Sequence, residues 1–187
     1  GKQYYGNLLG LLRKSTGDDQ TRKYDFSYDA ASRITSASFT QLSNNSFNLS
    51  AGIDFSLNGM TYDANGNIVT LNQKGWKPGG SVTIDSLLYT YFDNSNRLKN
   101  VLDRTNDVNT KLGDFRSSSA YMSLLANNKT TGSTNYSYDS VGNLVKDMNR
   151  DINNGGANGI LYNYMRLPET VYINGKGSID YIYDGAG

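Results

Sequence analysis

The sequence predicts an all-β chain: a repeat array of antiparallel β-hairpins that forms an extended, twisted or spiral sheet. Three observations predict it. A short unit with one spacing recurs along the chain, and the composition is rich in Tyr (15) and Gly (20) at only 37% hydrophobic residues. The acidic residues are nearly all Asp, which favours turns, and Glu169 is the single Glu. This balance suits a sheet with two partly solvated faces rather than a deep core.

The recurring unit is clearest at residues 136–145. Tyr136 and Tyr138 are two positions apart, so both point to one face of a strand. Asp139 to Gly142 predicts a type I turn followed by a left-handed residue, because Asp bonds back to the backbone and Gly takes positive φ. Residues 143–145 then begin the return strand. The unit is therefore strand, turn, strand.

The same spacing gives three further complete copies and one that has only begun at the chain end. The copies share an aromatic residue, an Asp, an Asn or Arg, and an Ile or Leu. In chain order these repeat residues are Tyr28, Asp29, Ile34; Tyr62, Asp63, Gly66, Asn67, Ile68; Phe92, Asp93, Arg97, Leu98; Tyr138, Asp139, Gly142, Asn143, Leu144; and Tyr183, Asp184. Ser32 and Asn96 are expected at the left-handed position where other copies have Gly. Several copies at one spacing indicate a repeat protein.

These units resemble the YD repeats of the RHS (rearrangement hotspot) family, in the variant of Bacteroidetes-type RHS proteins. The flanking segments at 5–8, 24–29, 113–116 and 162–168 extend the resemblance over essentially all 187 residues. The resemblance implies a segment of a YD-repeat shell, a long sheet that spirals into a hollow wall. In larger relatives the shell encloses a C-terminal toxin or effector.

The resemblance also implies the function that we expect, a non-catalytic structural segment of such a wall. The implied partners are the remainder of the same RHS polypeptide and an enclosed C-terminal toxin, in a protein that is secreted or on the bacterial cell surface. We expect the chain to be part of a longer protein. No Asp-Pro-x-Gly pattern is present, so the self-cleaving aspartyl core of such shells is not expected here. The alternative is a cell-surface carbohydrate-binding or adhesion module.

We expect one YD-repeat region over residues 1–187. Its units are predicted at 1–14, 23–39, 60–71, 87–102, 134–148 and 160–173, with a truncated unit at 178–187. The Leu spacing within 1–14 also fits a helix face, but the Tyr-Gly-Asn-Leu opening favours a return strand. The unit at 160–173 lacks the Asp turn, and Leu167-Pro168 is expected to form another corner.

The sequence also predicts three elements between these units and one strand within the truncated unit. Ile53, Phe55 and Leu57 alternate and predict a strand. Residues 74–80, rich in Gly with one Pro, predict a loop that carries the only Trp, Trp76. Residues 120–126 favour a short helix, and 178–183 predict the last strand.

Composition excludes several classes of function. With no His and no Cys, the chain lacks the residues of Ser-His-Asp, Cys-His and ordinary zinc sites. The net charge is +1 without a basic cluster, which argues against nucleic-acid binding. No apolar stretch is long enough for a membrane-spanning helix. We therefore predict no enzyme activity, no cofactor and no metal.

Asp residues alone could still make a glycosidase or a calcium loop. The turn aspartates occupy equivalent positions in every copy, which favours a structural role over catalysis. Asp63, Asn65 and Asn67 faintly resemble a calcium loop, but its Gly is fourth and its twelfth residue is Lys74. A structural turn is the preferred interpretation.

The tyrosines have two interpretations. They could form a glycan-stacking surface, or they could form cross-strand ladders that hold neighbouring hairpins in register, which we prefer. Trp76 is the best single candidate for a ligand contact. Unpaired strand edges also predict self-association. The tyrosines concerned are Tyr4, Tyr5, Tyr24, Tyr28, Tyr89, Tyr91, Tyr136, Tyr138, Tyr162, Tyr164, Tyr181 and Tyr183.

Overall fold

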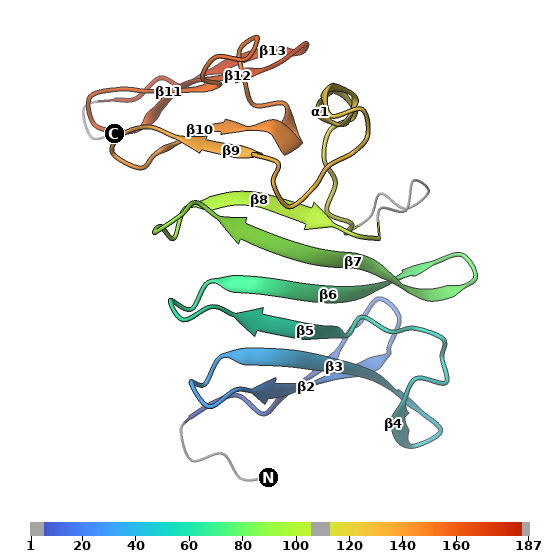
Figure 1. The fold of residues 1–187 in the computed structure, drawn as a ribbon. Helices are drawn as coiled ribbons and strands as arrows, with labels where there is room; N and C mark the ends of the chain where they lie inside the picture. The colour runs from blue at the N-terminus through green and yellow to red at the C-terminus, as the bar shows by residue number, and fades with distance from the viewer. Residues whose placement is uncertain (1–5, 106–112, 185–187) are drawn as a thin grey trace. The chain divides into compact units, whose positions relative to one another are not determined.

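The computed structural model describes residues 6–105 and 113–184, which fold mostly as antiparallel β-sheet (Figure 1). Within these residues, the helical elements are α1 (Ser119–Leu124) and the single 3₁₀ turn η1 (Met148–Arg150). The predicted all-β class is confirmed, and so is the short helix predicted at 120–126. Tyr4, Tyr5 and residues 185–187 of the predicted truncated unit lie outside the described residues.

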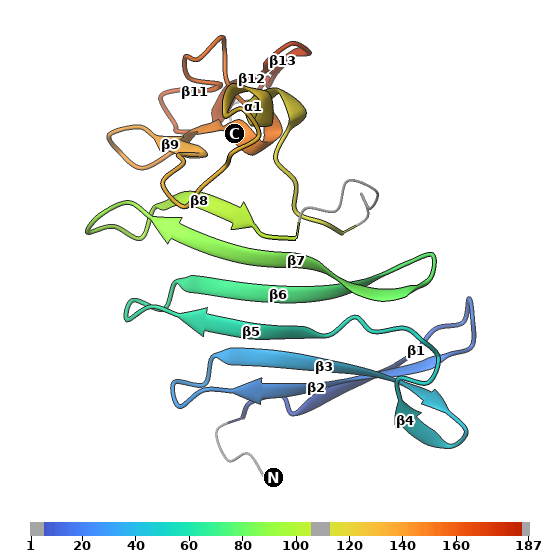
Figure 2. The same cartoon turned by 45° about the vertical axis from the view of Figure 1, so that its right-hand side comes forward.

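The largest sheet has eight strands, in the order β1-β2-β3-β5-β6-β7-β8, with β4 pairing with β3 off this path. Figure 2 shows β1 as well, which pairs with β2 at the edge of this sheet. The strands are β1 (Gly10–Lys14), β2 (Thr21–Tyr28), β3 (Ile34–Ser43), β4 (Ser46–Asn48), β5 (Leu57–Tyr62), β6 (Ile68–Lys77), β7 (Gly80–Tyr91) and β8 (Leu98–Asp103).

Two small antiparallel sheets follow. One consists of β9 (Tyr136–Tyr138) and β10 (Leu144–Asp147), and the other of β11 (Ile160–Tyr162), β12 (Pro168–Ile173) and β13 (Gly177–Asp180). The predicted last strand thus ends three residues earlier than expected, at Asp180. The strand pairs β2–β3, β5–β6, β7–β8, β9–β10 and β11–β12 lie where the sequence predicts hairpins.

The chain divides into two compact units. The first contains residues 1–88 and 103–115, and the second contains residues 89–102 and 116–187. The strands β7 and β8 each contribute residues to both units.

Aromatic packing organises the first unit. Phe39 on β3 is 2% exposed. Its ring meets those of Tyr24 and Phe55 edge-on, with centroids 5.4 and 5.3 Å apart. Tyr24 and Phe39 are also directly paired across β2 and β3, and Tyr24 stacks along its own strand on Phe26 at 6.4 Å. This cross-strand aromatic pair lies within the single hairpin β2–β3, whereas the predicted ladder joins neighbouring hairpins.

The strand predicted from Ile53, Phe55 and Leu57 is wrong, because only Leu57 belongs to a strand, β5. Polar side chains hold the preceding residues in an irregular path. The Ser56 hydroxyl accepts the N–H of Phe39 at 2.9 Å, and the Asp54 carboxylate, with its side chain 8% exposed, accepts the Lys74 ammonium at 2.8 Å. Ser56 and Asp54 therefore use hydrogen bonds that differ from those of a regular strand ladder.

The loop predicted at 74–80 is also wrong. β6 continues through Trp76 to Lys77, and Lys77 pairs with Gly80 across the two-residue turn Pro78-Gly79. Gly79 and Gly80 take φ of 108° and 134°, which glycine permits. The Gly and Pro residues thus make a tight hairpin turn, and Trp76 lies on a strand with 51% of its surface exposed.

A buried polar residue organises the second unit. Asn135 is fully buried. Its Oδ1 accepts the N–H of Val101 at 3.0 Å, and its Nδ2 donates to the hydroxyl of Tyr121 on α1 at 2.9 Å. Ser118 caps α1 by accepting the N–H of Tyr121. Asn135 thus ties the helix to β8 in this unit.

Candidate functional site

The predicted repeat residues converge on one recurring turn. At the first copy, the N–H of Asp29 donates to the carbonyl of Arg33 at 2.9 Å, and the N–H of Ser32 donates to the carbonyl of Asp29 at 3.0 Å. The same two bonds recur in the turns 63–67, 139–143 and 163–167. Four turns therefore share one backbone hydrogen-bond pattern.

The fourth residue of each of these turns is left-handed. Its φ is 61° at Ser32, 86° at Gly66, 99° at Gly142 and 63° at Arg166. The register of the strand pair shifts beside each of these turns. The predicted loop, a type I turn followed by a left-handed residue, is confirmed for the copies at Asp29, Asp63 and Asp139.

The aspartate side chain closes the turn from inside. Oδ1 of Asp63 accepts the N–H groups of Asn65 and Asn67 at 2.9 and 2.8 Å, and its Oδ2 accepts the Asn67 amide at 2.8 Å. Asp29 and Asp139 make the equivalent three bonds. The side-chain bond from Asn67 is the main factor that lowers the pKa of Asp63. These oxygens therefore bind their own turn, where a calcium loop would need them for the ion.

The variant unit at 160–173 uses the same turn, so the prediction of a different corner at Leu167-Pro168 is wrong. Oδ1 of Asn163 accepts the N–H groups of Met165 and Leu167 at 2.9 and 3.0 Å, as the aspartates do in other copies. An amide oxygen accepts these bonds in the same geometry as a carboxylate oxygen. Asn163 is a turn residue that the sequence motif missed.

The third copy is shifted by one residue from its predicted alignment. The N–H of Phe92, rather than that of Asp93, bonds to the carbonyl of Arg97 at 3.0 Å. The left-handed residue is Asn94, with φ 53°, and the prediction of Asn96 is wrong. One inserted residue lengthens this turn, so Tyr91 occupies the position equivalent to Tyr28.

The tyrosine before each turn reaches back to the preceding hairpin. The Tyr62 hydroxyl donates to the carbonyl oxygen of Ile34, the first residue of β3, at 2.6 Å. The same kind of bond joins Tyr28 to Leu8 at 2.7 Å, Tyr138 to Leu98 at 3.1 Å, Tyr162 to Leu144 at 2.8 Å and Tyr183 to Pro168 at 2.6 Å. The acceptors Leu98, Leu144 and Pro168 also begin their strands. Each bond therefore connects two successive hairpins.

Arginine strengthens this connection where it replaces asparagine in the turn. Nε of Arg33 donates to Asp29 at 2.7 Å within its own turn, and Nη1 donates to the carbonyl of Asp63 at 3.3 Å. Its guanidinium also lies over the ring of Tyr62, 4.5 Å from the centroid. Arg97 lies over Tyr138 in the same way, at 5.8 Å.

Other tyrosines are packing residues. Burial raises the pKa of Tyr136 to about 12, and burial also raises the pKa of Tyr24, which packs on Phe39. Tyr164, by contrast, is 93% exposed. The tyrosines thus do not form one exposed surface, and these burials favour the packing interpretation.

The structure brings together three carboxylates that the sequence did not link. Oxygens of Asp85, Asp103 and Asp114 lie within 4.8 Å of one another in the first unit. Oδ1 of Asp85 accepts the N–H of Phe115 at 2.7 Å, and Oδ1 of Asp103 accepts the N–H of Ser86 at 2.9 Å. Burial, helped by the charge of Asp103, raises the pKa of Asp85. Carboxylates so arranged could bind a divalent cation, and this cluster is the candidate metal centre of the described residues.

A scan against models of protein families, a search of curated proteins and a search of solved structures each find no match to this chain. Among the described residues, no helix is long and apolar enough to span a membrane.

Proposed function

We propose that this chain is a non-catalytic structural segment of a bacterial RHS-type YD-repeat protein, and that it builds part of the wall of a β-shell. The observation that carries the proposal is the tyrosine hydroxyl bond from one repeat unit to a backbone carbonyl of the unit before it. Five such bonds are found in the described part of the chain. A bond that recurs between neighbouring units is what a repeat wall needs, because each unit gains its stability from the next.

The turn chemistry supports a mechanical role rather than a reaction. The carboxylates of Asp29, Asp63 and Asp139 each accept three hydrogen bonds from their own turns. Such bonds favour the charged form and lower the pKa, which is the wrong direction for a general acid near neutral pH. The absence of His and Cys from the sequence points the same way.

The proposed partners follow from the resemblance to RHS proteins. They are the remainder of the same polypeptide, which would continue the wall, and a C-terminal toxin or effector enclosed by it. The proposed location is outside the cytoplasm, either secreted or on the bacterial surface.

The parent gene provides the first test. We expect many further YD units on both sides of this segment, followed by a distinct C-terminal domain. An open reading frame that ends close to residue 187 would contradict the shell, because too few strands would remain to close one.

Protease protection in the parent protein provides the second test. We expect the enclosed C-terminal domain to resist limited proteolysis in the intact shell. A parent protein carrying Tyr62→Ala and Tyr138→Ala should release it faster, because two connections between hairpins are lost. The matched control is Tyr164→Ala, at an exposed tyrosine. Equal cleavage of the domain in all three proteins would show that the wall does not protect it.

A further inference from the structure

A lysine, a serine and an asparagine form a closed triangle of hydrogen bonds in the second unit. Nζ of Lys129 donates to Oδ1 of Asn149 at 2.8 Å and to Oγ of Ser117 at 2.7 Å. Oγ of Ser117 donates to the same Oδ1 at 2.8 Å. Lys129 lies in the connection between α1 and β9, and Asn149 lies on η1. The triangle therefore joins two segments that are 20 positions apart.

The surrounding residues hold the amine and the amide together. Asn149 is 2% exposed, and its carbonyl accepts the N–H of Ser118 at 3.0 Å, which fixes the serine segment to η1. The Lys129 ammonium also lies over the ring of the buried Tyr121, 5.9 Å from the centroid. Contacts on both sides thus keep Nζ beside the Asn149 side chain.

The amide nitrogen of Asn149 is the unusual atom of this site. Nδ2 is buried and has no hydrogen-bond partner in the described part of the chain. A buried donor that stays unpaired lowers the stability of a fold, and such an atom calls for a physical explanation. A reaction in which the lysine amine displaces this nitrogen as ammonia would remove the unpaired donor.

The geometry is close to that of such a reaction. Nζ of Lys129 lies 2.8 Å from Oδ1 of Asn149, and a C=O bond is about 1.2 Å long, so Nζ is within about 4 Å of Cγ. Reacting atoms in a near-attack geometry are about 3–3.5 Å apart, so a small movement is sufficient. The Ser117 hydroxyl already donates to the oxygen on which negative charge would develop.

A carboxyl group lies next to the same amide. Oδ1 of Asp147 accepts the backbone N–H of Asn149 at 2.9 Å. Burial raises the pKa of Asp147, and the bonds from Asn149 and the charge of Arg150 act in the opposite direction. A carboxyl group with a raised pKa is better suited to proton transfer near neutral pH. Asp147 can therefore carry a proton at this site.

We propose that Lys129 and Asn149 become joined by an intramolecular isopeptide bond, with Asp147 as the proton carrier. The Lys129 ammonium loses a proton to water, and the lone pair of Nζ attacks Cγ, which forms the Nζ–Cγ bond and places negative charge on Oδ1. Nζ and Nδ2 then share one carbon, so the Asp147 carboxylate can take a proton from Nζ and pass it to Nδ2. The C=O bond reforms, the Cγ–Nδ2 bond breaks, and ammonia leaves with its electron pair.

This step needs no oxidant, metal or cofactor. The ammonia takes up one proton from water, which balances the proton that the lysine lost. The reaction occurs once in each chain and has no turnover, so it is compatible with a structural segment. It is also independent of the wall-forming role, and each proposal can fail without the other.

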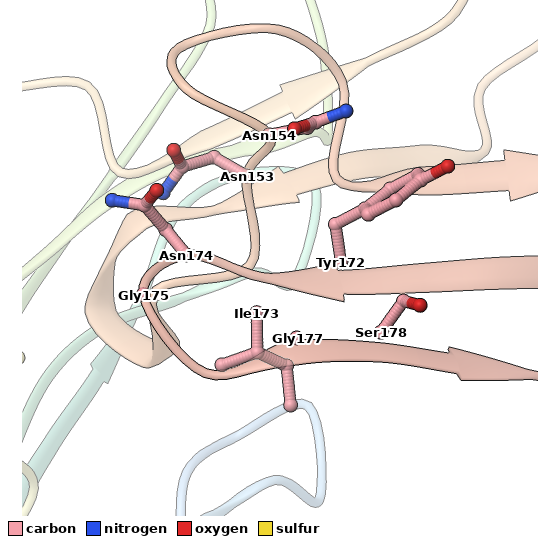
Figure 3. Close-up of a pocket in the computed structure, with 8 residues that line it drawn as sticks. All are labelled: Asn153, Asn154, Tyr172, Ile173, Asn174, Gly175, Gly177 and Ser178. Atoms are coloured by element: carbon pink, nitrogen blue, oxygen red, sulfur yellow. The ribbon is translucent and has the colours of Figure 1, made fainter.

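Other asparagines of the second unit lack a lysine in this position. The asparagine pocket, which Asn153, Asn154 and Asn174 help to line, lies beside the turn that joins β12 and β13 (Figure 3). The lysine of that turn, Lys176, pairs instead with Asp151 at 3.6 Å, and its side chain is 67% exposed. Lys176 therefore provides a control lysine beside asparagines.

Mass spectrometry of the intact, denatured chain provides the test. We expect a mass that is lower than the sequence mass by one molecule of ammonia. Trypsin cleaves after Arg116, Lys146 and Arg150 but not after a lysine in isopeptide linkage, so one branched peptide should join residues 117–146 to residues 147–150. An Asn-Gly succinimide would also release ammonia but would give no branched peptide.

Two results would overturn the proposal. One is a folded chain that has the full sequence mass, both freshly purified and after prolonged storage. The other is a loss of ammonia without the branched peptide.

Variants assign the roles of the residues. Lys129→Arg keeps the positive charge but lacks the primary amine, so it should give no branched peptide. Asp147→Asn should form the bond about 100-fold more slowly, the usual contribution of a proton-transferring group. Lys176→Arg is the matched control and should be linked like the unmodified chain. Circular dichroism reports whether each variant folds, and an unchanged rate in folded Asp147→Asn would refute the role of Asp147.

Discussion

The hydroxyl of Tyr62 donates to the carbonyl oxygen of Ile34 over 2.6 Å, although 28 positions separate the two residues. Ile34 is the first residue of β3, and Tyr62 is the last residue of β5. The strands themselves meet at a single register pair, Ala37 with Leu57. The tyrosine bond therefore secures the turn end of this interface, where the strand ladder does not reach.

Removing that hydroxyl tests its contribution. We expect Tyr62→Phe to lower the free energy of unfolding by about 1 kcal/mol, the usual value of one such bond. The shift in Tm should be about 2–4 °C for a chain of this size. Thermal unfolding followed by circular dichroism measures it. Tyr164→Phe, at a 93% exposed residue, is the control and should leave Tm unchanged; equal losses in both variants would remove the special role of Tyr62.

Replacing Arg33 by lysine should destabilise the fold. Lysine keeps the charge but cannot bond Asp29, reach the carbonyl of Asp63 and cover the ring of Tyr62 at the same time. We expect Arg33→Lys to cost about 1 kcal/mol in urea unfolding. Arg13→Lys, at an exposed arginine of the same unit, should cost little. If Arg33→Lys left the free energy of unfolding unchanged, the positive charge alone would account for the contribution of Arg33.

At the left-handed position of the turns, substitutions to and from glycine should change the stability in opposite directions. Arg166, with φ 63°, carries a side chain where glycine is preferred, so Arg166→Gly should stabilise by up to about 1 kcal/mol. Gly66, with φ 86°, has open space where a Cβ would lie, with no heavy atom within 4 Å, so Gly66→Ala should destabilise by about 1 kcal/mol through backbone strain alone. Urea unfolding of both variants measures the change in the free energy of unfolding. A change in the same direction for both would contradict the preference for glycine at this turn position.

Two aspartates should contribute to the stability of the fold with opposite dependences on pH. Burial and the charge of Asp103 raise the pKa of Asp85, so its ionisation weakens the fold as pH rises from the ordinary value of 3.8 through the raised value. The stability of Asp85→Asn relative to the unmodified chain should therefore improve across that window. Its Oδ1 can still accept the N–H of Phe115.

Asp139 provides the control for this effect. Burial acts to raise its pKa, but hydrogen bonds from Asn143 and its neighbours outweigh burial and lower it. Ionised Asp139 thus stabilises the fold above pH 3.8, and this stabilisation is lost as the pH falls through the lowered pKa. Asp139→Asn should therefore lose relative stability as pH rises. Urea unfolding from pH 3 to pH 7 compares the stabilities of Asp85→Asn and Asp139→Asn. If both changed with pH in the same direction, the opposite pKa shifts of the two aspartates would be contradicted.

The edge strand β1 predicts self-association. Leu12 on this strand is 61% exposed, and β1 is the last strand on its side of the sheet. Light scattering should detect association that grows with concentration, and Leu12→Lys should reduce it because charged side chains protect strand edges. Leu124→Lys, at a 75% exposed leucine of α1, is the control. A monomer at all concentrations would refute this prediction.

The turns could be predicted because their code is local. Asp63 and Gly66 lie within one short segment. The N–H of Gly66 donates to the carbonyl of Asp63, the Asp63 carboxylate accepts the N–H of Asn67, and both bonds follow from turn geometry alone. The motif misses Asn163 because it requires an acid, whereas the turn needs only an acceptor oxygen. It misaligns the third copy because Phe92 and Asn94 fit the spacing only with one inserted residue.

The remaining errors concern contacts distant in sequence. The alternation that ends at Leu57 resembles a strand, but the bond from the N–H of Phe39 to the Ser56 hydroxyl holds this segment in another path. The Gly and Pro residues after Trp76 favour a loop, and the strand is revealed by its pairing with β7, as of Trp76 with Ser81. The acidic cluster and the asparagine pocket combine residues from separate segments, which no local pattern links.

All five tyrosine bonds have the same polarity along the chain. The acceptor always precedes its donor in the sequence, from Leu8 with Tyr28 to Pro168 with Tyr183. On a ribosome, each carbonyl is therefore synthesised before the hydroxyl that will bind it. A hairpin that emerges finds its anchor already in place, and no unit has to wait for a later one to make this bond. Such a chain can be built vectorially, one hairpin on the last, during translation.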